Sequence, residues 1–182
     1  GSNERVHGWL DEGINSANEL RYVETKYPNN ALVGGVDGPN KIAKKFDLDR
    51  YKHRAQYYQL YAFCARTHVD QPIETHSKDF TSLNYGSIMY MKSAIVFDYL
   101  RNYLGDSLYD HCFQVYFDKW HWKHPGPEDI RAVFETESGR DLGWFFDDLI
   151  KTDKQIDYKI SSIPKTNDPK NLMPQGEIVV MV

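Results

Sequence analysis

Apolar residues recur at the spacing of an α-helix along most of the chain, and glycine or proline residues interrupt the pattern at intervals. This pattern gives each helix one apolar stripe, and the stripes are expected to pack together because this buries their apolar surface. The breaks predict helices at about 8–27, 49–68, 82–104 and 106–120, another from Pro127 to a stop at Gly139, and a last one at 141–149. In the third helix the predicted buried stripe comprises Ile88, Ile95, Val96, Tyr99, Leu100 and Tyr103. The sequence therefore predicts a mainly α fold.

The pattern changes after residue 151. Segments 158–163 and 177–182 are rich in β-branched residues and predict two strands, with a proline- and asparagine-rich region between them. Two strands are marginal on their own, which indicates the opening of a larger β module. We expect a helical unit over residues 1–152 and a short β tail over 153–182, which is the start of a β module or a linker.

Composition limits the classes of function. The 182 residues carry 22 Lys and Arg against 26 Asp and Glu, a formal net charge of −4, so no general basic field favours nucleic acid. No apolar run approaches the roughly 20 residues that a membrane-spanning helix needs. Cys64 and Cys112 lie within apolar helical patterns, which predicts buried thiols. These features favour a globular protein and leave its compartment open.

The most specific motif opens the first predicted helix. Residues 8–13 read G-W-L-D-E-G, and residues 14–22 continue with I-N-S-A-N-E-L-R-Y. Acidic residues suit the start of a helix, so Asp11 and Glu12 have an ordinary explanation in the helix dipole. A carboxylate is equally a common zinc ligand, and catalytic zinc sites use three protein ligands plus a water. Spacing alone favours the helix-start explanation. The resemblance of the whole segment to a known family, described next, favours a ligand role for Glu12.

This segment resembles the one that carries the third zinc ligand in gluzincin metallopeptidases of the aminopeptidase N family (peptidase family M1), bacterial members in particular. In that family an H-E-x-x-H helix supplies two histidine ligands and the catalytic glutamate, and a W-L-x-E-G segment about eighteen residues later supplies a further glutamate. The resemblance makes Glu12 that ligand. Glu19 lies on nearly the same helix face and becomes a candidate to orient a zinc-bound histidine, with a solvated or salt-bridged glutamate as the alternative.

A second motif stands at residues 85–92, which read Y-G-S-I-M-Y-M-K. It resembles the family's helix with a Y-x-K pattern, in which Tyr90 matches the catalytic tyrosine and Lys92 the lysine. The family usually has glycine after that lysine, and here Ser93 stands there. The resemblance implies that the phenol of Tyr90 donates a hydrogen bond to the oxyanion, whereas composition alone would favour a core tyrosine. Tyr85 is a poorer candidate, because in an α-helix it would lie nearly half a turn from Tyr90.

The resemblance extends over about residues 3–158. It implies the helical C-terminal subdomain of a thermolysin-like catalytic domain, in a zinc-dependent aminopeptidase that acts on peptides. Only eleven residues precede Glu12, and the sequence contains no H-E-x-x-H. We therefore expect both histidine ligands and the general base in an upstream half of the same polypeptide, which would be this chain's structural partner. We expect the isolated chain to bind no zinc and to be inactive.

Two other functions stay open from the sequence. The chain could be a non-catalytic α-helical interaction module that kept the peptidase fold, and the presence or absence of H-E-x-x-H upstream would separate the two. Another gluzincin chemistry, such as epoxide hydrolysis, is a third option. His121 and His124 have a metal-like spacing, but a proline follows and no cysteine or carboxylate accompanies them at ligand spacing. They predict a structural helix end rather than a metal site.

Overall fold

The computed structural model describes residues 2–32 and 41–154. These residues form helices joined by loops, and no β-strand occurs among them. The prediction of a mainly α fold is thus confirmed. The strands predicted at 158–163 and 177–182 lie outside the described residues.

The longer helices follow the predicted breaks closely. They are α1 (Glu12–Lys26), α3 (Arg54–Arg66), α5 (Ser93–Leu104), α6 (Asp106–Trp120) and α7 (Pro127–Ser138). Shorter helical elements are η1 (Gly8–Leu10), α2 (Lys41–Lys45), η2 (Leu48–Arg50), η3 (Ser77–Asp79), α4 (Ser82–Asn84), and two π-helical segments, η4 (Tyr85–Lys92) and η5 (Trp144–Ile150). The helix predicted at 49–68 begins later, because Leu48–Arg50 forms a separate 3-10 turn after Asp47, whose φ is +57°.

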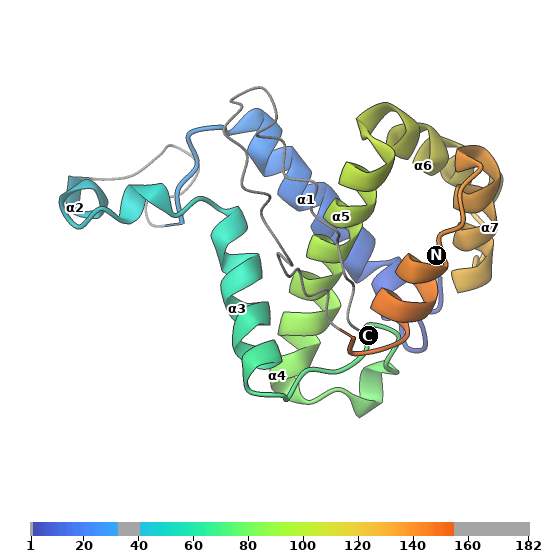
Figure 1. Cartoon of the computed structure of the whole chain (residues 1–182), viewed down its shortest axis with the longest axis horizontal. Helices are drawn as coiled ribbons and strands as arrows, with labels where there is room; N and C mark the ends of the chain where they lie inside the picture. The colour runs from blue at the N-terminus through green and yellow to red at the C-terminus, as the bar shows by residue number, and fades with distance from the viewer. Residues whose placement is uncertain (1, 33–40, 155–182) are drawn as a thin grey trace, which may run out of the picture.

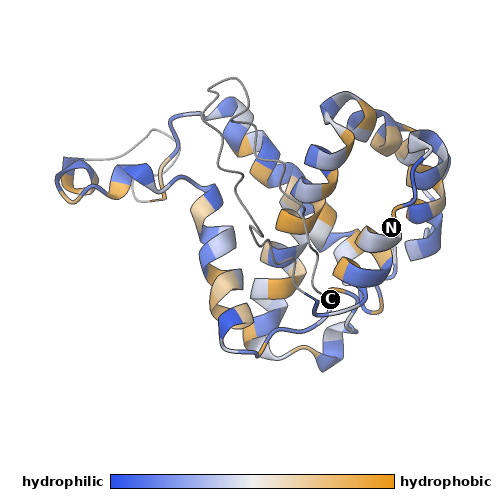
Figure 2. Ribbon diagram, viewed as in Figure 1, coloured by the Kyte–Doolittle hydropathy of each residue, from blue (hydrophilic) through white to orange (hydrophobic). Residues whose placement is uncertain are grey.

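The central pair of helices is α1 and α5, which pack against each other along their lengths (Figure 1). On one side α3 packs against η4, and on the other α6 follows α5 and pairs with α7. The short helix α2 projects from this body (Figure 1). In Figure 2 hydrophobic and hydrophilic residues share each long helix, as expected for amphipathic helices round a common core. The site described below lies where α1 meets η4.

The core is centred on the buried faces of η4, α5 and η5. Its buried side chains include Trp9, Ile88, Met89, Val96, Phe97, Leu100, Phe134 and Phe145. The stripe predicted for α5 was wrong at Tyr99 and Tyr103, which are 39% and 47% exposed. Phe97 is fully buried on the inner face, whereas the ring of Tyr103 packs at the surface against Trp144. The other members of the predicted stripe, Ile88, Ile95, Val96 and Leu100, are buried.

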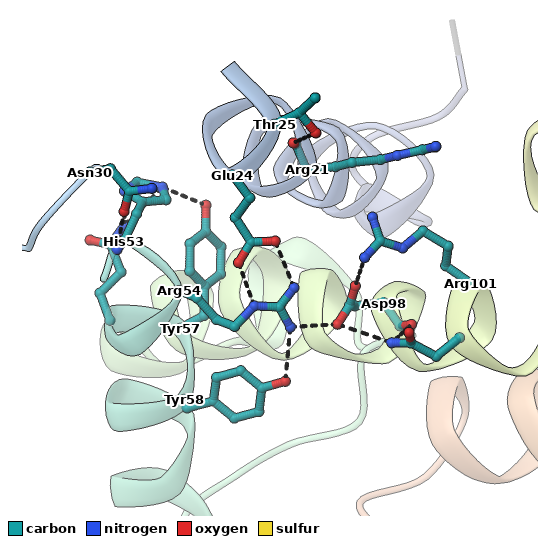
Figure 3. Close-up of polar contacts among 12 residues, drawn as sticks. Arg21, Glu24, Thr25, Asn30, His53, Arg54, Tyr57, Tyr58, Asp98 and Arg101 are labelled. Atoms are coloured by element: carbon teal, nitrogen blue, oxygen red, sulfur yellow. Dashed lines mark hydrogen bonds and ion pairs between the residues drawn. The ribbon is translucent and has the colours of Figure 1, made fainter. Parts of the chain in front are cut away.

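A network of charged side chains ties three helices together (Figure 3). Arg54 on α3 donates to both carboxylate oxygens of Glu24 on α1, at 2.5 and 2.7 Å, and to Asp98 on α5 at 2.6 Å. Asp98 is largely buried and also pairs with Arg101 at 2.9 Å. Because Arg54 joins α1, α3 and α5 at once, it fixes their relative positions.

Both cysteines are buried free thiols, as predicted. In the part of the chain that the structure describes, no helix combines the length and the apolar character that crossing a membrane requires.

Candidate active site

Two glycines bring the start of α1 unusually close to the helix that carries Tyr90. A Cβ atom on Gly13 would lie 2.8 Å from the Cβ of Ser93, and one on Gly8 would lie 2.7 Å from the Cε of Met89. Real Cβ atoms do not approach so closely, so Gly13 cannot carry a side chain unless the helices move, whereas at Gly8 the end of the flexible Met89 side chain would have to shift. Glu12 therefore enters α1 at the point where this helix meets the junction of η4 and α5.

Tyr90 lies in the π-helical segment η4. The Ser93 hydroxyl just after it donates to the carbonyl oxygen of Ile88 at 3.0 Å, across five residues. In a π-helix, residues five apart lie nearly above one another. The rings of Tyr85 and Tyr90 accordingly contact edge to face, with centroids 5.9 Å apart. The prediction that Tyr85 lies half a turn away was wrong, because it assumed the α-helical period.

The structure brings Glu12 and Tyr90 together, although they are far apart in the sequence. Burial raises the pKa of Tyr90, and a hydrogen bond to the Glu12 carboxylate and the charge of that carboxylate raise it further. Tyr85 adds a smaller contribution of the same sign. The phenol of Tyr90 thus keeps its proton at neutral pH and lies near the Glu12 carboxylate. Both side chains are only partly buried, so other groups can reach them.

The neighbours of Glu12 are held by other contacts. The Asp11 carboxylate accepts from the Asn15 side chain at 2.9 Å, which suits the helix-start position expected for it. The Ser16 hydroxyl donates to the backbone carbonyl oxygen of Glu12 at 2.7 Å, so it does not bind the Glu12 carboxylate. Of the acidic pair, Glu12 is therefore the one that faces Tyr90.

Glu19 faces a different helix. Its carboxylate accepts from the Tyr57 hydroxyl at 3.2 Å and lies 3.4 Å from Nε2 of His53, and both partners belong to the α3 region. Two helical turns separate it from Glu12, about 10 Å along the axis. These contacts match the salt-bridged alternative for Glu19, and a role toward a zinc-bound histidine stays a prediction.

Lys92 points away from the Glu12–Tyr90 contact. Its side chain is 1% exposed, its Nζ lies 3.8 Å from Oδ2 of Asp70, and it faces the ring of Tyr61 at 5.5 Å. Burial lowers the pKa of Lys92, and the charge of Asp70 opposes that effect. The lysine of the Y-x-K pattern thus belongs to the packing of η4 against α3.

Glu12 alone cannot hold a catalytic metal ion. Among residues 2–32 and 41–154, no three His, Cys, Asp or Glu side chains are grouped so that they could bind one. His121 caps the end of α6, where its Nδ1 lies 2.9 Å from the backbone oxygen of Phe117, as predicted for a structural helix end. A catalytic zinc takes three protein ligands. The half-buried Glu12 carboxylate beside a phenol donor fits one of the three, and the described residues do not provide the others.

A cavity of about 480 Å³ opens beside this site, between α1 and α6. Its lining includes Asp11, Ile14, Tyr109, Phe113, Phe117 and Trp122. Glu12 and Tyr90 do not line it. The start of α1 therefore presents Asp11 and Ile14 to the cavity and Glu12 to η4.

Comparison with known proteins identifies one family. The model of the peptidase family M1 domain matches residues 6–149 of the 182, which include both Glu12 and Tyr90. No curated protein and no solved structure matches the chain.

Proposed function

Because the chain belongs to peptidase family M1, we propose that it is the helical, Glu12-bearing part of a zinc aminopeptidase. The M1 family is zinc-dependent in general. The observation that carries the proposal is the contact between Glu12 and Tyr90. The two motifs that resemble the family's zinc-ligand and oxyanion-donor segments support these roles for Glu12 and Tyr90.

In this proposal Glu12 contributes one carboxylate to the metal. The two histidine ligands and the general base come from an H-E-x-x-H helix that is not among residues 1–182. When bound, zinc supplies a Lewis acid for the substrate carbonyl and lowers the pKa of a water. The tight crossing at Gly13 and Ser93 holds the Glu12 side chain on the η4 side of α1.

Tyr90 stabilises the negative charge that develops on the substrate's carbonyl oxygen. Its phenol keeps its proton and lies near the Glu12 carboxylate, which supports a place for it beside the proposed metal. With a cation held by Glu12, the Tyr90 phenol would donate its hydrogen bond to the substrate's oxyanion. The edge contact with Tyr85 fixes the ring in this position.

Substitution of Tyr90 by Phe in the zinc-loaded peptidase that contains this chain tests the proposal. We expect kcat on an aminoacyl 4-nitroanilide to fall by roughly 10²–10³-fold, the usual cost of removing one oxyanion donor. KM should change much less, because the hydrogen bond forms only as charge develops. Zinc content should be unchanged, since the phenol is not a ligand.

Two further substitutions serve as comparisons. Tyr85→Phe keeps the ring contact and should lower kcat by less than about tenfold, because its phenol adds only to the surroundings of Tyr90. Tyr22→Phe, on the exposed side of α1, should leave kcat unchanged. Near-full kcat for Tyr90→Phe would contradict the role of Tyr90. A larger loss for Tyr85→Phe than for Tyr90→Phe would exchange the two roles.

A further inference from the structure

One carboxylate holds the segment that leads into Glu12. Glu74, in the loop between α3 and η3, accepts from the indole Nε1 of Trp9 with one oxygen, and its other oxygen pairs with Nδ1 of His7. His7 and Trp9 stand five and three residues before Glu12. Both oxygens of a single side chain thus fix two positions of the turn that precedes α1.

Glu74 is itself anchored to the core. Its backbone N–H donates to the carbonyl oxygen of Ile150 at 3.0 Å, at the end of η5, and the adjacent Ile73 is fully buried. The Glu74 side chain is 21% exposed, and the Trp9 side chain is fully buried. A hydrogen bond to a charged and partly desolvated acceptor is stronger than one at the open surface. The carboxylate is therefore a fixed point and not a mobile surface group.

Other contacts bind the same segment to the same loop. The backbone N–H of Ser77 donates to the carbonyl oxygen of Arg5 at 2.9 Å, and the Ser77 hydroxyl donates to that of Glu4 at 2.8 Å. Gly8 packs directly against Met89, the residue before Tyr90. The turn at η1 is thus enclosed between the Glu74 loop and η4, and Glu12 follows it after one residue.

From this arrangement we infer that Glu74 is a positioning residue for Glu12, acting through Trp9 and His7. The inference rests on the proposed function, because it gives Glu12 a metal to bind. Rotation or displacement of η1 would move the first turn of α1 and with it the Glu12 carboxylate. Groups that orient metal ligands affect metal affinity or activity by roughly 10–100-fold, even though they do not touch the metal.

The test replaces Glu74 by Gln in the zinc-loaded peptidase that contains this chain. Glutamine keeps one acceptor oxygen for the Trp9 indole, but it carries no charge and offers His7 an NH2 donor in place of a carboxylate oxygen, so the charge-assisted character of both contacts is lost. We expect the dissociation constant for zinc, measured by competition with a chelator, to rise about 10–100-fold. The matched control is Glu128→Gln, because Glu128 is exposed and pairs only loosely with Lys151, at 3.5 Å. It should leave zinc affinity unchanged.

A double-mutant cycle with Trp9→Phe shows whether Glu74 acts through the indole. Phenylalanine removes the N–H donor and keeps an aromatic ring beside Phe97. If the effect passes through this contact, Glu74→Gln and Trp9→Phe together should weaken zinc binding by less than the product of their separate effects. Trp9→Phe also keeps the inference testable if Glu74→Gln does not fold, because it should itself weaken zinc binding at least severalfold.

The outcomes separate this inference from the proposed function. Suppose that Glu12→Ala loses zinc but Glu74→Gln binds zinc within about twofold of the wild-type affinity. This result would overturn the role of Glu74 and leave the proposed function standing. A protein that keeps its zinc on Glu12→Ala would overturn the proposed function and, with it, this inference. Fully multiplicative effects in the cycle would overturn the route through Trp9.

Discussion

The proton on Tyr90 is held by several effects that act on one side chain. Burial comes first, then the hydrogen bond and the charge of Glu12, and then Tyr85, and all of them raise the pKa of Tyr90. A phenol of this kind donates hydrogen bonds without losing its proton at neutral pH. It is therefore suited to stabilise an oxyanion by donation. When a cation neutralises Glu12, the pKa of Tyr90 should fall, because the largest nearby negative charge is then compensated.

A second carboxylate gives a prediction that concerns pH. Asp110 on α6 accepts from both guanidinium nitrogens of Arg21 on α1, one of them at 2.8 Å, and this bond lowers the pKa of Asp110 below its ordinary value of 3.8. The pair therefore contributes stability above about pH 4 and loses that contribution as the pH falls through the folded-state pKa. The Asp110 side chain is 51% exposed, so solvent screening limits the contribution to about 0.2–1 kcal/mol.

Asp110→Asn should accordingly lower the free energy of unfolding at pH 6 by this amount and leave it nearly unchanged near pH 2. Urea unfolding across that range measures the difference. Asp118→Asn, on the same helix, is the control, because its side-chain oxygen can still accept from Gln114. An equal loss for Asp110→Asn at both ends of the range would show that the charge of Asp110 is not involved.

At the scale of the elements, the contact between Gly13 and Ser93 decides how α1 meets η4 and α5. The family's usual glycine after the Y-x-K lysine is replaced by Ser93, and the space that its side chain fills is the space that a side chain at position 13 would need. Ser93 is fully buried, so it cannot turn outward to make room. The absence of a side chain at position 13 therefore helps to place Glu12 beside Tyr90.

Gly13→Ala should destabilise the protein in spite of the better helix propensity of alanine. Overpacking lowers the free energy of unfolding by about 1–3 kcal/mol, and the better helix propensity of alanine offsets about 1 kcal/mol of that loss. In a Ser93→Gly background the closest contact is removed and only the Cβ of Trp9, at 3.3 Å, stays near, so the same substitution should be clearly less destabilising. Urea unfolding of the four proteins in this cycle measures the coupling. A stabilising effect of Gly13→Ala in the wild-type background would show that the helices separate easily at this point.

The sequence predicted the helices best where glycine and proline mark their ends. Gly105 separates α5 from α6, Pro127 begins α7, and Gly139 ends it with a φ of +63°. The π-helical form of η4 was not predicted, because composition does not distinguish a five-residue from a four-residue hydrogen-bond spacing. That difference explains the error at Tyr85. Tyr99 and Tyr103 lie in the regular helix α5, and the apolar pattern misassigned them because tyrosine is often exposed.

Within the site, the two motifs predicted Glu12 and Tyr90 on separate helices, and the structure places them near each other. The sequence could not predict the contribution of Glu74, because it lies in a connecting loop and meets Trp9 only through tertiary packing. Gly8 and Gly13 were visible in the first motif, but the side chains that they contact, Met89 and Ser93, are distant in sequence.

At the scale of the whole molecule, several polar contacts tie the helices around the site to one another. Arg54 joins α1, α3 and α5 through Glu24 and Asp98 (Figure 3), and Glu74 joins the start of α1 to the loop that follows α3. Arg21 and Asp110 join α1 to α6. The helices thus form a scaffold that presents one carboxylate and one phenol at a shared position.

The central claim is that Glu12 binds the catalytic zinc, and the most direct test is the zinc content of Glu12→Ala after dialysis, measured beside its hydrolysis of an aminoacyl substrate. The protein is the peptidase that contains this chain, with Glu4→Ala as a control at an exposed glutamate of the same segment. We predict that Glu12→Ala loses both zinc and activity, because a three-ligand site is reduced to two, while Glu4→Ala keeps both. A full zinc complement in Glu12→Ala would contradict the claim.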